Sequence, residues 1–140
     1  MRRWSIAMMS VVLAAVVSCG DGGGEAEGSG AGEEAIRDVT VEEADAMLGS
    51  GEGLVVLDIR TADEYDEGHI PGARNIDFRG EEFRDEVAAL DREGKYLVHC
   101  AGGGRSGSSL AVFQELGFGE VYHLADGMNG WEAEGKTIEK

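Results

Sequence analysis

A glycine loop that follows a buried strand constrains this chain more than any other feature. Residues 96–98 are apolar, and His99, Cys100, Ala101, three glycines and Arg105 come directly after them. The apolar periodicity of residues 106–116 predicts a helix behind the loop. Glycines allow the backbone to curl so that several N–H groups point at the sulfur, and the helix N-terminus adds to them. These donors and the arginine charge favour the thiolate of Cys100, which indicates a reactive cysteine rather than an inert buried one.

The hydrophobic pattern of the rest of the chain predicts strands that alternate with helices. Strands are predicted at residues 54–59, 74–76, 95–99 and 121–124, and the apolar stretch at 54–59 is typical of a buried central strand. Helices are expected over residues 41–48, 62–67, 82–90, 106–116 and 130–133. This alternation predicts a single α/β domain with a mostly parallel central sheet of about five strands, flanked by helices on both faces. Ligand sites of such sheets lie at the carboxyl ends of strands, where Cys100 is expected.

Three local motifs mark the starts of helices. Thr40 with Glu43, and Thr61 with Glu64, have the spacing of a capping box, in which each side chain accepts a backbone N–H of the other residue. Ser106 has a side chain suited to cap the helix behind the cysteine loop.

The N-terminal segment has the composition of an export signal. Two arginines follow Met1, residues 6–17 are mostly apolar, and Ser18 and Cys19 come directly after them. This order resembles the signal and lipobox of bacterial lipoproteins, which implies cleavage before Cys19 and lipidation of its thiol. Two other interpretations stay open: an ordinary secretory signal with an incidental cysteine, and twin-arginine export, which the paired arginines suggest.

The composition also predicts how the chain is divided. We expect a signal peptide at residues 1–18, a flexible tether rich in Gly and Glu at 19–34, and a folded domain at 35–140. The domain would then lie outside the cytoplasm, in the periplasm or cell envelope, anchored by lipid to a bacterial membrane.

Charge and cysteine content limit the partners of the chain. Its formal net charge of −16 argues against nucleic acid as a partner and against adsorption to anionic lipid through a basic patch. The chain has two cysteines, so lipidation of Cys19 leaves Cys100 without an intramolecular partner, as expected of a reactive thiol in an exported protein. The three histidines show no metal-ligand spacing with Cys100, so no metal and no cofactor are expected.

Several motifs, taken together, resemble the rhodanese family. They cover residues 39–135 and comprise Leu57–Arg60, Glu64-Tyr65, Gly68–Ala73, the Cys-x-x-Gly-x-Arg-Ser loop at Cys100–Ser106, and the terminal Gly127 and Trp131. The resemblance implies a sulfurtransferase in which Cys100 attacks the outer sulfur of a small anionic donor such as thiosulfate and carries it as a persulfide. A thiol or cyanide, or the thiol of a partner protein, would then accept the sulfur.

The resemblance also gives neighbouring residues their expected roles. The sulfur anion would be held by the loop residues Ala101, Gly102, Gly103, Gly104, Arg105 and Ser106. Arg105 would either orient the anionic donor or brace the loop. Asp58, Arg60 and His69 are expected to support the loop through structural polar contacts. His99 is a weak candidate for proton transfer, since consecutive strand residues point to opposite faces.

The chain departs from the family pattern at two places, and two other functions compete. Asp126 stands where the family has the first of two glycines before its terminal helix, and Ala101, Gly102 and Gly104 provide no side chains to select a substrate. The loop of cysteine phosphatases resembles this one but has five residues between cysteine and arginine, where this chain has four. The fold is also compatible with a non-catalytic module in which Cys100 serves a binding or redox partner.

Overall fold

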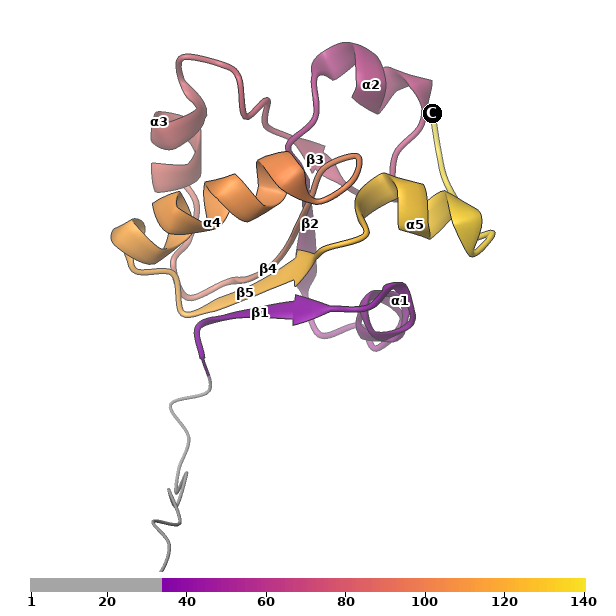
Figure 1. Cartoon of the computed structure of the whole chain (residues 1–140). Helices are drawn as coiled ribbons and strands as arrows, with labels where there is room; N and C mark the ends of the chain where they lie inside the picture. The colour runs from indigo at the N-terminus through magenta and orange to yellow at the C-terminus, as the bar shows by residue number, and fades with distance from the viewer. Residues whose placement is uncertain (1–33) are drawn as a thin grey trace, which may run out of the picture.

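Five parallel strands form one sheet at the centre of the domain (Figure 1). In this computed structural model, which describes residues 34–140, the strands are β1 (Ile36–Val39), β2 (Leu54–Asp58), β3 (Arg74–Asn75), β4 (Lys95–His99) and β5 (Glu120–Leu124). Their order across the sheet is β1-β5-β4-β2-β3. The cysteine-bearing strand β4 therefore lies in the middle, which confirms the predicted α/β class and its parallel sheet.

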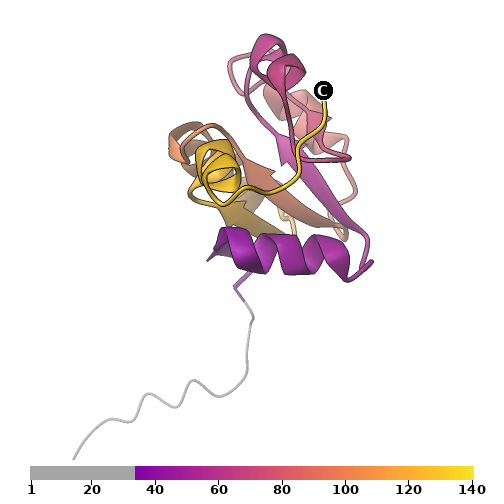
Figure 2. The same ribbon diagram turned by 90° about the vertical axis from the view of Figure 1, so that its right-hand side faces the viewer.

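Helices cover both faces of this sheet, as the two perpendicular views show (Figures 1 and 2). One face carries α3 (Phe83–Ala88) and α4 (Gly104–Leu116), and the other carries α1 (Val41–Gly49), α2 (Ala62–Glu67) and α5 (Gly127–Ala133). Alternation along the strands supplies both layers of the core, because Val98 packs with α3 and α4 while its neighbour Leu97 packs with α1 and α5.

The two capping boxes fix the starts of α1 and α2 as predicted. The N–H of Thr40 donates to the Glu43 carboxylate at 2.8 Å, and the N–H of Glu43 donates to the Thr40 hydroxyl at 3.2 Å. The same reciprocal pair joins Thr61 and Glu64 at 3.0 and 3.3 Å. These short helices thus begin with their first N–H groups satisfied.

Three details of the sequence prediction were wrong. Strand β1 was not predicted, because two of its four residues are charged and it occupies an edge of the sheet. Ser106 does not cap α4, since the helix begins at Gly104 behind an N-cap at Gly103 and Ser106 lies within the first turn. Helix α5 begins at Gly127, three residues before its expected start.

The expected signal peptide and most of the expected tether lie outside the described residues. Between residues 34 and 140, no helix combines the length and the apolar character that a membrane span requires.

The loop after β4 approaches the start of α5 so closely that two positions require glycine. The N–H groups of Met128 and Asn129 donate to the carbonyl oxygens of Cys100 and Ala101 at 2.8 and 2.9 Å. Gly127 has a φ of +61°, and a Cβ atom there would lie 2.5 Å from the Ala101 carbonyl oxygen. Gly103 has a φ of +90°, and a Cβ there would lie 2.0 Å from the carbonyl oxygen of Ala125. Glycine at these positions allows the loop to dock on α5.

We expect Gly103→Ala to destabilise the domain far more than Gly117→Ala, its matched control. Both glycines flank α4 with positive φ, but a Cβ at Gly117 meets nothing within 4 Å. Both variants should lose about 1 kcal/mol for left-handed backbone strain, and Gly103→Ala should lose at least about 3 kcal/mol in all, because the Ala125 carbonyl must move. Urea unfolding measures both losses, and equal losses would contradict the close approach.

Candidate active site

Cys100 lies at the carboxyl end of β4, where the chain turns into the glycine loop. Its Sγ accepts hydrogen bonds from the Gly103 N–H at 3.1 Å and from the Ser106 hydroxyl at 3.4 Å. The residue is only 2% exposed, so a substrate reaches the sulfur through the rim of the loop rather than over an open surface. Helix α4 points its N-terminus at this position, as the loop spacing predicted.

The surroundings of Cys100 lower the pKa of its thiol. Burial alone raises this pKa, since it penalises the charged form. Hydrogen bonds from the Ser106 hydroxyl and from the N–H groups of Ser106, Gly102 and Gly103 outweigh burial and favour the thiolate. The loop therefore forms an anion cradle built from backbone donors and one hydroxyl.

Arg105 braces the loop through a paired contact with α2. Its two terminal nitrogens donate to the two oxygens of Glu64 at 2.7 and 2.8 Å. The hydrogen bond from Arg105 lowers the pKa of Glu64 to about 2, with the contacts of Thr61 adding to it against the effect of burial. Of the two roles expected for Arg105, this geometry matches the bracing one, because both terminal nitrogens bind a carboxylate.

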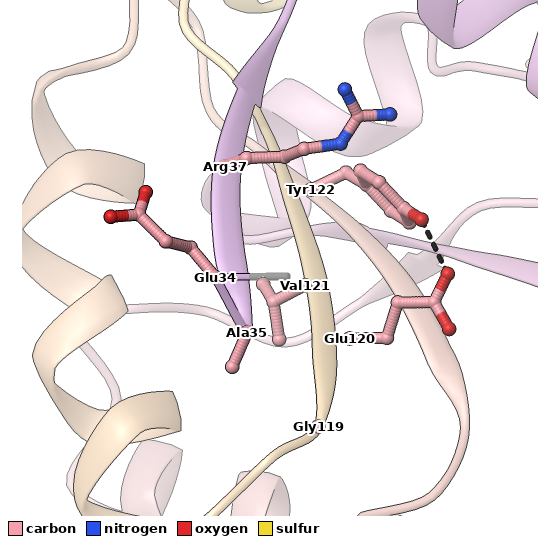
Figure 3. Close-up of a pocket in the computed structure, with 7 residues that line it drawn as sticks. All are labelled: Glu34, Ala35, Arg37, Gly119, Glu120, Val121 and Tyr122. Carbon is pink, nitrogen blue, oxygen red and sulfur yellow. Dashed lines mark hydrogen bonds between the residues drawn. The ribbon is translucent and has the colours of Figure 1, made fainter. Parts of the chain in front are cut away.

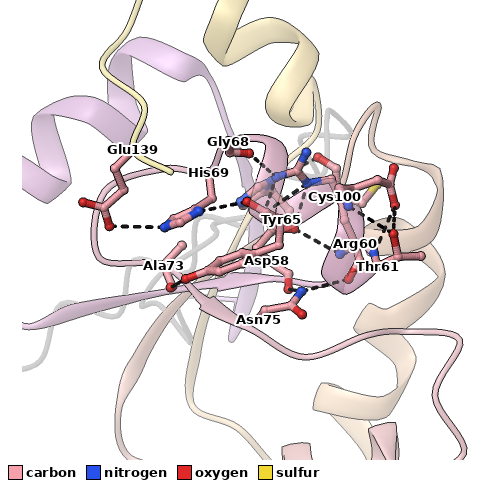
Figure 4. A network of polar contacts seen from close by, with 12 residues as sticks. Asp58, Arg60, Thr61, Tyr65, Gly68, His69, Ala73, Asn75, Cys100 and Glu139 are labelled. Atoms are coloured by element: carbon pink, nitrogen blue, oxygen red, sulfur yellow. Dashed lines mark hydrogen bonds and ion pairs between the residues drawn. The ribbon is translucent and has the colours of Figure 1, made fainter.

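A second charge pair anchors the turn that follows α2 (Figure 4). Arg60 contacts both oxygens of Asp58, with Nη2 2.6 Å from Oδ2, and donates to the Gly68 carbonyl at 2.7 Å. The amide of Asn75 donates to the carbonyls of Asp58 and Arg60. These contacts fix both ends of α2, so Arg60 supports the cysteine loop indirectly, through the helix that carries Glu64.

His69 contacts α2 and the C-terminal segment rather than the cysteine loop. Its Nδ1 lies 2.9 Å from the carbonyl oxygen of Tyr65, its ring stacks on the Tyr65 ring, and its Nε2 lies 3.3 Å from Glu139 (Figure 4). The histidine therefore joins α2 to the C-terminal segment.

His99 is buried between the loop backbone and Asp58. Its Nδ1 lies 3.0 Å from the Cys100 carbonyl oxygen, and its Nε2 lies 3.8 Å from Oδ2 of Asp58 without a hydrogen-bond partner among the described residues. Burial lowers the pKa of His99, with Asp58 opposing it, and thus favours the neutral ring.

Sequence reasoning missed three residues around the cysteine loop. Glu64 was predicted to cap a helix and to belong to the family motif, but its pairing with Arg105 was not predicted. His123 on β5 and Asp38 on β1 were given no role, yet Nε2 of His123 lies 2.8 Å from the Ser106 hydroxyl and its Nδ1 lies 2.8 Å from Asp38. The alternation of residues along β5 was the one indication of a buried role for His123, since it places this residue on the same face as the buried Val121.

A hollow of about 390 Å³ lies beside β1 and β5, at the end of the sheet opposite to the one that carries Cys100 (Figure 3). It is lined by Glu34, Ala35, Arg37, Gly119, Glu120, Val121 and Tyr122. Because it lies at the amino ends of β1 and β5, it is not part of the Cys100 site. Within residues 34–140, no cluster of three or more His, Cys, Asp or Glu side chains is arranged to hold a metal ion.

Comparison with known proteins identifies the family of this domain. The Rhodanese-like domain family matches residues 40–134, more than half of the chain, so the chain belongs to that family. The thiosulfate sulfurtransferase GlpE of Stutzerimonas stutzeri is 37% identical over 96 residues, which cover 69% of this chain and 84% of that protein. The GlpE of Pseudomonas paraeruginosa is 38% identical over 58% of this chain and 72% of its own length. These similarities support a rhodanese sulfurtransferase.

The fold comparison agrees with this assignment. The crystal structure of a rhodanese-related protein from Thermoplasma volcanium superimposes with a TM-score of 0.64 at 28% identity. The superposition covers 74% of this chain and 97% of the other.

We expect Glu64→Gln to lower the free energy of unfolding by about 1 kcal/mol at pH 7, because the charge pair with Arg105 is partly exposed to solvent. The amide of glutamine can still cap α2, so the change isolates the pair. Since the pKa of Glu64 falls from 4.5 to about 2 on folding, the advantage of the native carboxylate is complete above pH 4.5 and is lost as the pH falls towards 2.

Urea unfolding of both proteins between pH 2 and pH 7 measures this difference. Glu67→Gln, an exposed position on the same helix, is the control and should match the wild type. A difference between wild type and Glu64→Gln that does not change with pH would contradict the charge pair.

Proposed function

We propose that this chain is a sulfurtransferase that carries sulfane sulfur as a persulfide on Cys100. The observation that carries the proposal is the position of Sγ, held by the Gly103 N–H and the Ser106 hydroxyl at the carboxyl end of β4. The similarity to proteins named thiosulfate sulfurtransferase supports thiosulfate as a donor.

The bonds to sulfur form and break at the cysteine and its cradle. The Cys100 thiolate attacks the outer sulfur of thiosulfate, a sulfur–sulfur bond forms, and sulfite leaves with the electron pair of the bond that breaks. The new persulfide carries one negative charge, which the loop donors stabilise as they stabilise the thiolate. A thiol or cyanide, or the thiol of a partner protein, then attacks the outer sulfur and releases Cys100.

The loop itself has no side chain that selects a substrate, so selection depends on the residues around its rim. Ala101, Gly102 and Gly104 bring no long side chain, and a Cβ at Gly104 would meet nothing within 4 Å. Arg105 is neutralised by Glu64, so an anionic donor is bound mainly by backbone N–H groups. Such a site accepts the terminal sulfur of donors of different shapes.

Mass spectrometry after incubation with thiosulfate tests the proposal. We expect one added sulfur atom on Cys100 in the wild type, removed by cyanide, and no added sulfur in Cys100→Ala. Ser109→Ala, which loses a buried hydroxyl that donates to the Ser106 carbonyl, should still take up sulfur. A wild-type protein that binds no sulfur would contradict the proposal and favour a non-catalytic module.

The charge of the chain predicts how the rate depends on salt. A formal charge of −16 repels the thiosulfate dianion, so raising the ionic strength from about 0.01 to about 0.15 M should increase kcat/KM severalfold. Alkylation of Cys100 by neutral iodoacetamide is the control and should change little. A falling kcat/KM would instead indicate a cationic entry to the site.

We also propose that the chain is exported and anchored to a membrane by lipid on Cys19. The proposal rests on the sequence alone: the basic start, the apolar residues 6–17, and the cysteine after Ser18. The folded domain would then act in the periplasm or cell envelope.

Detergent partitioning of the full chain from a bacterial host tests the anchor. The wild type should enter the detergent phase and Cys19→Ala should stay in the aqueous phase, because the acyl chains supply the membrane affinity. Cys100→Ala, which leaves the signal intact, should behave as the wild type. A wild type that stays aqueous with a free Cys19 thiol would contradict lipidation.

A further inference from the structure

A chain of hydrogen bonds connects the Cys100 sulfur to a carboxylate at the protein surface. Ser106 Oγ lies 3.4 Å from Sγ and 2.8 Å from Nε2 of His123, and Nδ1 of His123 lies 2.8 Å from Oδ1 of Asp38. Ser106 is fully buried and His123 is 6% exposed, whereas the Asp38 side chain is 73% exposed. The chain therefore runs from the nucleophile through the core to solvent.

The sheet topology brings these residues together from distant parts of the sequence. Asp38 and His123 are register partners across β1 and β5, so their side chains lie side by side on one face. His123 is also the register partner of Val98 on β4, two residues before Cys100, which places the sulfur on the same face. The first turn of α4 covers that face with Ser106.

The hydrogen bonds define which atoms carry protons. A carboxylate only accepts, so Nδ1 of His123 donates to Asp38 and Nε2 of the neutral ring is an acceptor. The Ser106 hydroxyl is 2.8 Å from this acceptor and 3.1 Å from the Gly103 carbonyl oxygen. When the hydroxyl donates to Nε2, the lone pairs of its oxygen are available to the Cys100 thiol.

We propose that Asp38, His123 and Ser106 form a proton relay that generates the Cys100 thiolate. The thiol proton moves from Sγ to Ser106 Oγ while the hydroxyl proton moves from Oγ to Nε2 of His123. One S–H and one O–H bond break, and one O–H and one N–H bond form, so no other reactant is needed. The products are a thiolate and an imidazolium, and the Asp38 carboxylate stabilises the imidazolium.

This inference deepens the proposed sulfur transfer, on which it rests, by naming how the nucleophile is formed. Ser106 touches the reacting sulfur, whereas His123 acts through Ser106 and is a positioning residue. Among the described residues, the His123 ring contacts Asp38 on β1 and Ser106 on α4, lies beside Gly107 on α4, and has Val98 on β4 as its register partner. Asp38 is the titratable member of this set, and Cys100 is linked to the ring through Ser106.

The surroundings of the thiol are consistent with such a relay. Burial raises the pKa of Cys100, and the Ser106 hydroxyl is the largest of the contributions that overcome it. A hydroxyl whose other hydrogen bond is shared with a buried histidine can both donate to the thiolate and receive the thiol proton. Serine alone would supply only the donor.

The pH dependence of iodoacetamide alkylation, followed by peptide mass spectrometry at Cys100, tests the relay on the full chain. The test variant is His123→Gln, whose amide can reach Ser106 but accepts no proton near neutral pH. We expect the inflection to rise by about one pH unit, so that alkylation at pH 7 slows about tenfold while the rate at high pH stays unchanged. A merely structural role would lower the plateau and leave the inflection in place.

Asp38→Asn provides an independent variant with a mostly exposed side chain. We expect a shift in the same direction with about threefold slower alkylation at pH 7, since the imidazolium loses its counter-charge. Asp45→Asn, which removes a partly exposed carboxylate paired with Lys136, controls for the change in net charge and should keep the wild-type inflection. Wild-type inflections in both His123→Gln and Asp38→Asn would overturn the relay.

Titration of the His123 ring by NMR decides the question if His123→Gln does not fold. The relay predicts that alkylation of Cys100, which removes the thiolate, lowers the midpoint of the His123 titration, and an unchanged midpoint would overturn it. Neither measurement uses a sulfur donor. A relay without persulfide formation would therefore overturn the proposed function alone, and persulfide formation without a relay would overturn this inference alone.

Discussion

The docking of the cysteine loop on the start of α5 is the contact on which the site depends. Two backbone hydrogen bonds, from Met128 and Asn129 to the carbonyls of Cys100 and Ala101, hold the first two loop residues. With those carbonyls turned towards α5, the N–H groups of the following residues turn towards the sulfur. Gly127 makes the approach possible, because any Cβ at this position would overlap the loop backbone. The adjacent Asp126, where the family has a glycine, does not disturb it, since its backbone is right-handed helical.

Charge pairs then hold the other side of the loop. Asp58 and Arg60 fix the turn after α2, and α2 presents Glu64 to Arg105 on α4. Helix α2 thus connects the end of β2 with the cysteine loop. Few charged side chains are used to stabilise the sulfur itself. The cradle relies on hydrogen bonds from backbone groups, whose positions are set by packing rather than by flexible side chains.

Local features of the site were readable from the sequence, whereas pairings across the sheet were not. The strands predicted at residues 54–59 and 95–99, and the capping box at Thr61, depend only on neighbouring residues and were found within a residue of their predicted bounds. The N-cap at Gly103 was missed because a left-handed glycine contributes no side chain to recognise. His123 and Asp38 are 85 residues apart and meet only through the order of β1, β5 and β4, which no local pattern contains.

The position of β1 has a consequence for how this domain is delimited. The family similarity covers residues 40–134 and thus begins after β1 ends. A fragment cut at those limits would keep the whole cysteine loop but would turn β5 from an inner strand into an edge strand. Its unpaired N–H and C=O groups would then offer a template for association with other chains. The four residues of β1, outside the shared family region, therefore pair with β5 and replace it at the edge of the sheet with a short strand that carries two charged residues, a poorer template for association.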